Sequence, residues 1–301
     1  MSIINILVLG AHGQLGQAFN AVAGEFVAIT LHRVGRELDI TQPGLVSALL
    51  AKNQYDAVIN CAAFTDVNAA EQTVASAQDA YALNHLAVAS LAHTLKLQGG
   101  FLVHFSTDYV FDGNAHKPYT EHDTPYPINV YGQSKLKGEQ AMLKSNPPGL
   151  VIRTSWLFSP FGKNFVTHLL NVGRQEQTQT LNIVSDQVGS PTSALDLARA
   201  VLQLLTQRTQ TPHNQAWLTT QLLHFANAGQ ASWAQLASAV VQQAQLNCTI
   251  HPILTHQYSS PVKRPAYSVL NTQSLQTLLN TPIRSWQDAL QETLNWKSNA
   301  E

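Results

Sequence analysis

Tyr131 and Lys135 lie four residues apart in the segment NVYGQSKLKGEQ, which is compatible with a helix. That spacing puts a phenol and an ammonium group on one helix face, one turn apart. Upstream, the apolar run Phe101–Phe105 ends in a polar segment that contains Thr107, as a buried parallel strand would end. A hydroxyl at a strand end beside a Tyr/Lys pair is suited to moving a proton at a carbonyl oxygen.

A second constellation lies at the N-terminus. The apolar strand candidate Ile3–Leu9 runs directly into the turn GAHGQLG, and Gln17–Ala23 then has a helical pattern. A strand, a glycine turn and a helix form the phosphate-binding start of a dinucleotide fold, because the glycines let the backbone approach the pyrophosphate at the helix N-terminus. The spacing is GxxGxxG, so the flanking strand and helix carry most of the prediction. The cofactor contacts predicted in this turn are Gly10, His12, Gly13, Gln14, Leu15 and Gly16.

A second strand is predicted over Phe26–Leu31. An acidic residue near its end would bind the ribose of NAD, but Arg33 stands there and Arg36 follows. Cations suit a 2′-phosphate, which favours NADPH and leaves NADH possible. The alternative is that both arginines are solvated loop residues. Asp39 and Ile40 end this loop and are expected beside the adenine.

With such a cofactor, the Tyr/Lys pair acquires a specific role. Chance alone supplies roughly a quarter of one Tyr-xxx-Lys pair in a chain with 8 Tyr and 9 Lys, so the spacing by itself is a weak signal. Lys135 is expected to hold the nicotinamide ribose and to lower the pKa of Tyr131 from about 10 toward the working pH. Tyr131 then donates a proton to the substrate oxygen, and Thr107 orients that oxygen.

The remaining elements should position these groups. Strand and helix alternate over the first 157 residues, which predicts an α/β fold with a doubly wound parallel sheet of the Rossmann type. The strand Tyr55–Asn60 ends in Cys61-Ala62-Ala63, whose small side chains leave room for a cofactor, and Cys61 has no evident partner base. Ala75–Gln98 is predicted as one long helix in which Asn84 is either a buried polar link or an exposed amide.

After Trp156 the pattern loosens, which predicts a smaller C-terminal substrate-binding lobe. The predicted boundaries are 1–157 plus 193–229 for the Rossmann domain, and 158–192 plus 230–301 for the lobe. Within these ranges the sequence predicts helices at 164–172, 194–205, 232–245 and 285–296, strands at 181–184 and 222–226, a loop at 207–220 and an irregular segment at 261–270.

Composition excludes several classes of protein. Only 12% of the 301 residues are charged, the net charge is −1, and no basic block suggests a nucleic acid or an anionic membrane as partner. Two cysteines do not indicate a disulfide framework and suit the cytoplasm. The N-terminal run is expected to be a strand rather than a signal peptide, and no apolar run approaches the length of a membrane span. The 12 histidines are scattered without the spacing of a metal site.

Seven segments, in unbroken order over nearly the whole chain, resemble the dTDP-4-dehydrorhamnose reductase family. Members of this family are extended short-chain dehydrogenases/reductases that make dTDP-L-rhamnose. The segments are Gly10–Gly16, Asn60–Thr65, Ser106–Gly113, Tyr131–Glu139, Arg153–Trp156, Asp186–Thr192 and Arg264–Leu270. Of these, STDYVFDG and RTSW are much more specific than the glycine turn.

The resemblance implies a role for each of these segments. It implies NADPH-dependent reduction of the C4 keto group of dTDP-4-dehydro-L-rhamnose for cell-surface polysaccharide synthesis. Trp156 could instead be plain core, and Arg264 could be a loop end. The implied residues are Thr107, Tyr131 and Lys135 for catalysis, Ala62, Ala63 and Thr65 for the cofactor with the residues above, Val67, Asp108, Tyr109 and Trp156 for the sugar, and Asn164, Gln187 and Arg264 for the nucleotide diphosphate.

The sequence also departs from the family pattern. Asn68 stands where an Asp is frequent, so a salt link at this point is doubtful. Gln17 and Leu195 replace glutamates that hold magnesium at the dimer interface of some members, which predicts no such metal and a monomer or a differently built homodimer. Two alternatives stay open: another sugar-nucleotide reductase or epimerase, and a non-catalytic subunit like the regulatory β subunit of methionine adenosyltransferase. The intact STDYVF and RTSW segments favour the enzyme.

Overall fold

A six-stranded parallel sheet forms the centre of the molecule. The computed structural model describes residues 3–174, 179–211 and 214–298. The sheet order is β2-β1-β3-β4-β5-β10, and every pairing is parallel. This order confirms the predicted doubly wound fold. The strands are β1 (Ile4–Leu9), β2 (Ile29–Val34), β3 (Ala57–Asn60), β4 (Leu102–Thr107), β5 (Gly149–Thr154) and β10 (Thr220–His224).

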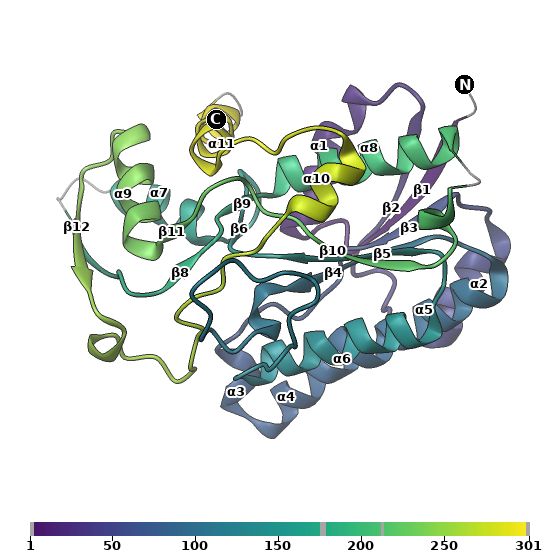
Figure 1. The fold of residues 1–301 in the computed structure, drawn as a ribbon, viewed down its shortest axis with the longest axis horizontal. Helices are drawn as coiled ribbons and strands as arrows, with labels where there is room; N and C mark the ends of the chain where they lie inside the picture. Colours follow the sequence, from purple (N-terminus) through teal and green to yellow (C-terminus); the bar gives the residue numbers. More distant parts are fainter. Residues whose placement is uncertain (1–2, 175–178, 212–213, 299–301) are drawn as a thin grey trace.

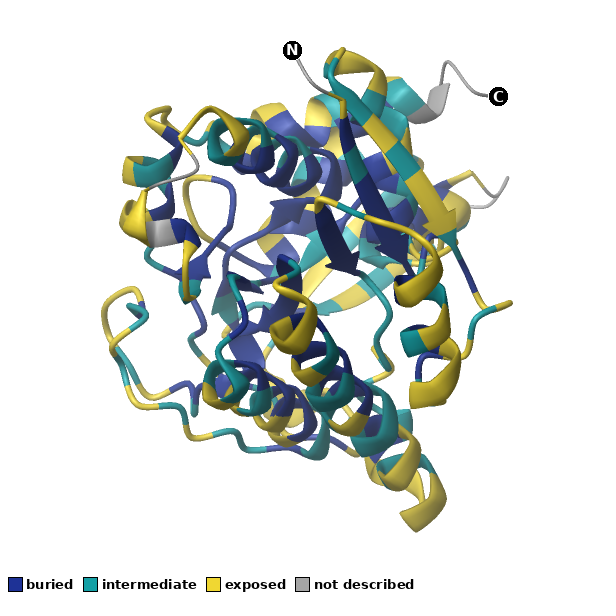
Figure 2. Ribbon diagram, turned by 90° about the vertical axis from the view of Figure 1, so that its right-hand side faces the viewer, coloured by how far each residue is buried: buried dark blue, intermediate teal, exposed yellow. Residues whose placement is uncertain are grey.

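Helices cover both faces of the sheet (Figure 1). One face carries α1 (Gln14–Val22) and α8 (Ala194–Gln210), and the other carries α2 (Pro43–Lys52), α5 (Ala87–Gln98) and α6 (Val130–Ser145). Alternate side chains of β1 pack on opposite faces, as a strand of period two requires. The central strands are therefore buried on both sides, while the outer faces of the helices are exposed (Figure 2).

The sheet order reverses between β1 and β3, because β1 pairs with β2 on one side and with β3 on the other. In open α/β sheets the ligand crevice lies outside the carboxyl ends of the strands at such a switch point. Gly10 follows β1 there with a φ of 71°, and a Cβ at Gly10 would lie 2.5 Å from the backbone nitrogen of Ala62. Only glycine fits this close approach of the two strand ends.

The predicted long helix Ala75–Gln98 is interrupted. It consists of α4 (Val74–Tyr81), the π-helical turn η2 (Ala82–Leu86) and α5. Asn84 lies in the π turn and is fully buried; its amide nitrogen donates to the Phe64 carbonyl and to Ser134 Oγ, both at 3.0 Å. Its amide oxygen accepts from the Phe64 backbone N–H at 2.9 Å. Asn84 is thus a buried polar link, and it joins this helix to the loop after β3 and to α6.

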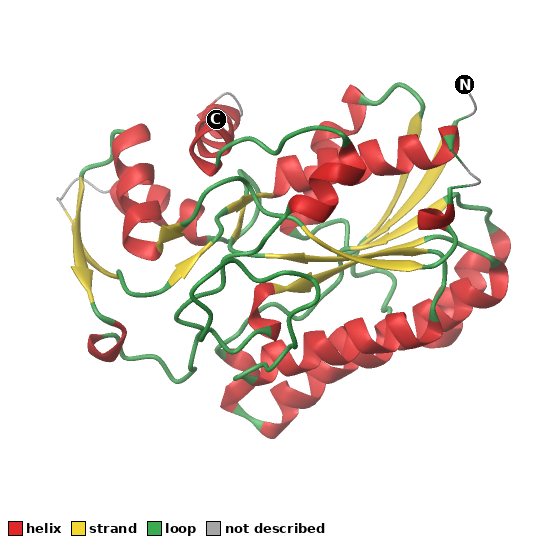
Figure 3. Cartoon of the chain, in the orientation of Figure 1, coloured by secondary structure: helices red, strands yellow, loops and turns green. Residues whose placement is uncertain are grey.

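The smaller lobe packs at the carboxyl edge of the sheet, on the left of Figure 3. Its core is formed mainly by α7 (Phe165–Gly173), α9 (Trp233–Gln243) and α11 (Trp286–Ser298), and the strand β7 (Gln179–Val184) pairs in parallel with β12 (Cys248–Ile253). The short elements are η1 (Ala23–Glu25), α3 (Ala69–Gln72), η3 (Asp108–Val110), β6 (Leu157–Phe158), β8 (Val188–Gly189), β9 (Thr192–Ser193), η4 (Gln215–Trp217), β11 (Ala231–Ser232), η5 (Thr255–Gln257) and α10 (Gln273–Leu279).

Several element boundaries differ from the sequence prediction. The second strand was predicted at Phe26–Leu31 but lies three residues later, so Arg33 belongs to β2 and not to the following loop. α8 extends to Gln210 into the predicted loop, and β12 and α10 were not predicted. Leu275 and Leu279 of α10 pack in the core of α1 and α8, so this part of 230–301 lies against the Rossmann core. The domain boundaries themselves stay a prediction.

A buried ion pair fixes α6 to the sheet. Arg153 of β5 donates from Nε to Glu139 Oε2 of α6 at 2.9 Å and from a terminal nitrogen to the other oxygen, and both side chains are about 2% exposed. His224 Nε2 lies 3.3 Å from the guanidinium, and burial, with the nearby Arg153 charge, lowers the pKa of His224 to about 3. The guanidinium also lies 5.0 Å from the centre of the Phe111 ring. This arrangement holds the helix that carries Tyr131 and Lys135.

Across residues 3–174, 179–211 and 214–298, no helix combines the length and the apolar character that crossing a bilayer requires.

Candidate active site

A cavity of about 530 Å³ lies at the carboxyl edge of the sheet. One side consists of residues from the glycine turn, and the other contains the predicted catalytic residues. Segments about 100 residues apart in the sequence therefore line the same cavity. Of the predicted site residues, those that line it are Gly13, Gln14, Leu15, Ala63, Thr65, Val67, Thr107, Asp108, Tyr109, Tyr131, Lys135, Trp156 and Asn164.

The glycine turn is shaped to accept a dinucleotide. Gly13 is the N-cap of α1 and contributes no side-chain cap, so the first N–H groups of this helix are not capped by a side chain at its N-terminus. A Cβ at Gly16 would lie 2.5 Å from the Gly10 carbonyl oxygen, which keeps the helix close to the strand. The residues present therefore fit a pyrophosphate at this helix N-terminus.

Thr107, Tyr131 and Lys135 come together through the start of α6. The Asn129 side chain caps this helix by accepting from the Gly132 N–H at 2.8 Å. A Cβ at Gly132 would lie 2.2 Å from the Tyr109 carbonyl oxygen, so the helix start packs directly on η3. Lys135 is buried, and its ammonium donates to the Phe105 carbonyl at 2.5 Å. The sequence spacing thus places phenol, ammonium and strand-end hydroxyl around one end of the cavity.

The electrostatics of this group differ from the sequence prediction. Burial raises the pKa of Tyr131 to about 12, although a hydrogen bond with the Thr107 side chain opposes the shift. Burial also lowers the pKa of Lys135 to about 8, against the favourable charge of Glu139. The expectation that Lys135 lowers the pKa of Tyr131 is therefore wrong, because burial dominates and the ammonium is held by the Phe105 carbonyl. Tyr131 keeps its proton at neutral pH, which is the form that a proton donor needs.

The buried carboxyl group of Asp108 hydrogen-bonds the Thr107 side chain. It is almost fully buried, and its two carboxylate oxygens accept from the Thr107 hydroxyl at 3.1 Å and the Ser155 hydroxyl at 3.0 Å. Ser268 also hydrogen-bonds this carboxyl group. Burial raises the pKa of Asp108 from 3.8 to about 6, while the three hydroxyls favour the charged form. Asp108 thereby fixes the orientation of the Thr107 hydroxyl.

This raised pKa predicts a pH-dependent contribution to stability. The folded protein binds the Asp108 proton more tightly than the unfolded chain does, so the free energy of unfolding falls as pH rises from about 4 to 6. Asp108→Asn is expected to remove this term, and the variant should gain stability relative to the wild type over that window. Urea unfolding at several pH values measures the difference, and a difference that is constant with pH would contradict the assignment.

An aromatic group separates this cavity from a second one. Trp156 stacks on Trp233 with ring centres 3.6 Å apart and an interplanar angle of 9°, and Phe165 meets Trp233 edge-on at 4.9 Å. Trp156 has a positive φ of 44°, and a Cβ at Gly189 would lie 2.5 Å from its indole ring. The indole ring of Trp156 therefore packs against the backbone of Gly189. Trp156 is part of the cavity wall and is not simply a residue of the hydrophobic core.

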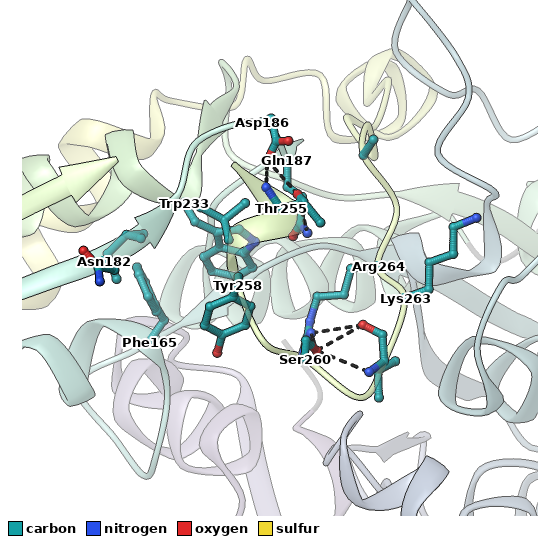
Figure 4. A pocket seen from close by; sticks show the side chains of 14 residues that line it. Phe165, Asn182, Asp186, Gln187, Trp233, Thr255, Tyr258, Ser260, Lys263 and Arg264 are labelled. Atoms are coloured by element: carbon teal, nitrogen blue, oxygen red, sulfur yellow. Dashed lines mark hydrogen bonds between the residues drawn. The ribbon is translucent and has the colours of Figure 1, made fainter. Parts of the chain in front are cut away.

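The second cavity, of about 600 Å³, lies in the smaller lobe and shares Phe165 and Trp233 with the first (Figure 4). Arg264 lines it and donates to Asn68 Oδ1 at 2.7 Å and to Ser260 Oγ at 2.5 Å. No carboxylate pairs with Arg264 in the part of the chain that the structure describes. Asn68 thus accepts a charge-assisted hydrogen bond from Arg264 in place of a salt link, and Arg264 also hydrogen-bonds the Tyr109 side chain.

Other predicted residues have structural roles around the two cavities. Gln187 lines the second cavity and donates to Thr255 Oγ1 at 3.2 Å, and Asn164 caps α7 by accepting from the Thr167 N–H at 3.0 Å. Asp39 accepts from Thr41 instead of facing the cavity. The remaining predicted residues, Gly10, His12, Gly16, Arg33, Ile40 and Ala62, are not part of the cavity lining.

Some cavity residues were not predicted as site residues. Phe165 and Trp233 begin helices and carry no motif, and Tyr258 and Lys263 lie in a segment without regular pattern. Arg36 lines the first cavity where Arg33 was favoured. Cys61 also lines it, and burial raises the pKa of its thiol well above the usual range, in keeping with a small hydrophobic side chain. Among the described residues no cluster of His, Cys, Asp and Glu is arranged for a metal ion.

A glycine turn at a sheet switch point, facing a Thr/Tyr/Lys group across one cavity, is the arrangement of a nicotinamide-dependent reductase of the short-chain dehydrogenase/reductase type. Comparison with known proteins narrows this class. Residues 4–298 match the family model "RmlD substrate binding domain". The chain belongs to this family, the dTDP-4-dehydrorhamnose reductase family of NAD(P)-dependent sugar-nucleotide reductases.

Individual relatives cover nearly the full chain. A dTDP-4-dehydrorhamnose reductase of Burkholderia thailandensis is 36% identical over 95% of this chain and 97% of its own length. The spore coat polysaccharide biosynthesis protein SpsK of Bacillus subtilis is 34% identical over 98% of both chains. The crystal structure of dTDP-4-dehydrorhamnose reductase from Bacillus anthracis in complex with NADP superposes with a TM-score of 0.87, at 29% identity, over 98% of this chain and 99% of that one.

Proposed function

We propose that this protein reduces the C4 keto group of dTDP-4-dehydro-L-rhamnose to dTDP-L-rhamnose with NADPH, in the cytoplasm, for the synthesis of a cell-surface polysaccharide. The observation that carries the proposal is the pair of adjacent cavities, which share Phe165 and Trp233 in their linings. One cavity brings the glycine turn to Thr107, Tyr131 and Lys135, and the other presents Arg264 without a carboxylate partner among the described residues. A ketosugar in the first and its nucleotide diphosphate in the second would fill both.

The chemistry needs a hydride at C4 and a proton at the C4 oxygen. The bound dinucleotide supplies the hydride. Tyr131, which is neutral at pH 7, donates its phenolic proton to the oxygen as negative charge develops there. The Thr107 hydroxyl donates to Asp108 Oδ1 in the structure, and it would turn that hydrogen toward the same oxygen when the ketone binds, which would fix the ketone against the phenol. Lys135 is buried one helical turn away, where its ammonium, held by the Phe105 carbonyl, would hold the ribose of the nicotinamide.

The second cavity suits the rest of the substrate. Its lining combines a guanidinium with apolar and aromatic side chains, among them Phe165, Val262 and Tyr258. A guanidinium binds phosphate oxygens bidentately, and an aromatic wall accepts a flat base. Because the two cavities meet at Trp233, one extended ligand can place its sugar near Tyr131 and its phosphates near Arg264.

We expect the purified protein to oxidise NADPH only when a 4-ketosugar nucleotide is present. Absorbance at the nicotinamide band measures the rate, and dTDP-4-dehydro-L-rhamnose should be turned over much faster than a UDP-linked 4-ketosugar. Equal or faster turnover of the UDP sugar would replace the proposed substrate with another sugar nucleotide. Absence of turnover with every ketosugar, although the cofactor binds, would contradict the reductase function.

A further inference from the structure

The segment Lys263–Leu270 carries Arg264 on the wall of the second cavity (Figure 4). Its backbone exchanges two hydrogen bonds with Val188, each 2.8 Å long, and donates a third to the Gly113 carbonyl at 3.2 Å. A Cβ at Gly113 would lie 2.6 Å from the Cα of Pro265, so the two backbones are in direct contact. The guanidinium in the second cavity is therefore attached to a backbone that is held at several points.

Asn129 connects this segment to the helix that carries Tyr131. The residue is only 3% exposed. Its amide oxygen accepts from the Gly132 N–H at 2.8 Å, at the start of α6, and its amide nitrogen donates to the Lys263 carbonyl at 3.1 Å. One side chain thus joins the first turn of the catalytic helix to the residue directly before Arg264, which is far away in the sequence.

The two bonds require an amide at this position. The Gly132 N–H needs an acceptor and the Lys263 carbonyl needs a donor, and an amide turned the other way would place donor against donor and acceptor against acceptor. Aspartate and serine are common helix N-caps as well. However, a charged carboxylate has nothing to donate, and the single oxygen of a serine cannot occupy both amide positions. Asparagine at this helix start therefore serves the bond to Lys263 as well as the cap.

We propose that Asn129 is a positioning residue that sets the span between the Tyr131 hydroxyl and the Arg264 guanidinium, and with it the alignment of one ligand that occupies both cavities. The inference rests on the proposed function, because it takes the second cavity to hold the nucleotide diphosphate. The segment around Arg264 determines where a ligand held by its phosphates presents its keto oxygen, and α6 determines where the proton donor lies. Asn129 bonds the backbones of both, and small displacements of reacting groups cost rate.

Reduction of the ketosugar nucleotide by NADPH tests this inference in two variants. Asn129→Asp and Asn129→Ser both keep a capping oxygen and lose the donor to Lys263, one with a charge and one without. Each is expected to lower kcat/KM by about tenfold, mainly through kcat, because the buried Lys263 carbonyl loses its partner. The Kd for NADPH should stay within about twofold of the wild type. A loss in the aspartate variant alone would assign the effect to its charge and overturn the inference.

Asn271→Asp is the matched control for the same exchange. The Asn271 side-chain oxygen accepts from the Gln273 N–H at 2.9 Å, a bond that aspartate can keep, and the residue lines neither cavity. This variant should keep the wild-type kcat/KM. A tenfold loss in this control as well would show that the effect is not specific to Asn129, and it would overturn the inference.

A double-mutant cycle with Arg264→Ala separates positioning from a purely structural role. Without the guanidinium the phosphates are no longer held at this segment, so Asn129→Ser should lower kcat/KM of the Arg264→Ala protein by less than about twofold. A further tenfold loss would show that Asn129 only orients α6, and unchanged turnover in the single variants would show that the bond to Lys263 contributes nothing; either result would overturn the inference. Absence of turnover by the wild type would reject the proposed function, and this inference with it.

Discussion

Replacing Tyr131 with phenylalanine is expected to lower kcat by about 10²–10⁴-fold and to leave the affinity for NADPH nearly unchanged. The phenol is neutral at the working pH and lies at the end of the cavity beside Thr107. Its hydroxyl group is therefore the proton donor in the reaction. Phenylalanine keeps the ring, which meets Tyr109 edge-on at 6.0 Å, and removes only the hydroxyl group. Single-turnover rates with saturating NADPH, together with the cofactor Kd, separate the two effects.

Tyr126 provides the matched control for this substitution. It lies five residues before Tyr131 and is 72% exposed, outside both cavities. Tyr126→Phe should keep the wild-type rate. If Tyr131→Phe also kept that rate, the proton donor would have to be another group, and the assignment of α6 as the catalytic helix would fail.

Glu139→Leu is expected to lower the free energy of unfolding by about 3–5 kcal/mol, because it leaves the Arg153 guanidinium buried without a counter-charge. This is a large share of the stability of an ordinary domain. Urea unfolding followed by far-UV circular dichroism measures the loss. The turnover rate of the same variant should also fall, since Glu139 lies one turn after Lys135 and fixes the helix that carries it.

The control for the ion pair is the double variant Glu139→Leu/Arg153→Met. Replacing both charges with apolar side chains removes the unpaired cation, so the double variant should recover much of the stability lost by the single one. A single variant within about 1 kcal/mol of the wild type would show that the pair contributes little to holding α6.

The sequence predicts the catalytic end of the molecule well, because local signals coincide there. Tyr131 and Lys135 are one helical turn apart, and Thr107 directly ends a buried strand, so short-range spacing suffices to place them. The strand–glycine–helix unit at Gly10 is equally local. The sheet is confirmed for the same reason, since each of its central strands is a largely apolar run.

Other features depend on tertiary packing and could not be read locally. β2 is an edge strand whose outward side chains are polar, so its periodicity did not fix its end and Arg33 was assigned to the loop. Trp233 meets Trp156 only through folding of the smaller lobe. The direction of the pKa shift at Tyr131 was also wrong, because a sequence gives the neighbouring Lys135 but not the degree of burial.

The most direct test of the proposed function is transfer of deuterium from NADPH labelled at C4 of the nicotinamide on the transferred side. Incubated with dTDP-4-dehydro-L-rhamnose, the protein should form dTDP-L-rhamnose that carries one deuterium at C4 of the sugar, with an equal amount of NADP⁺. Mass spectrometry and proton NMR of the isolated product give both quantities. Unlabelled product, deuterium at another carbon, or oxidation of NADPH without a reduced sugar would contradict the account.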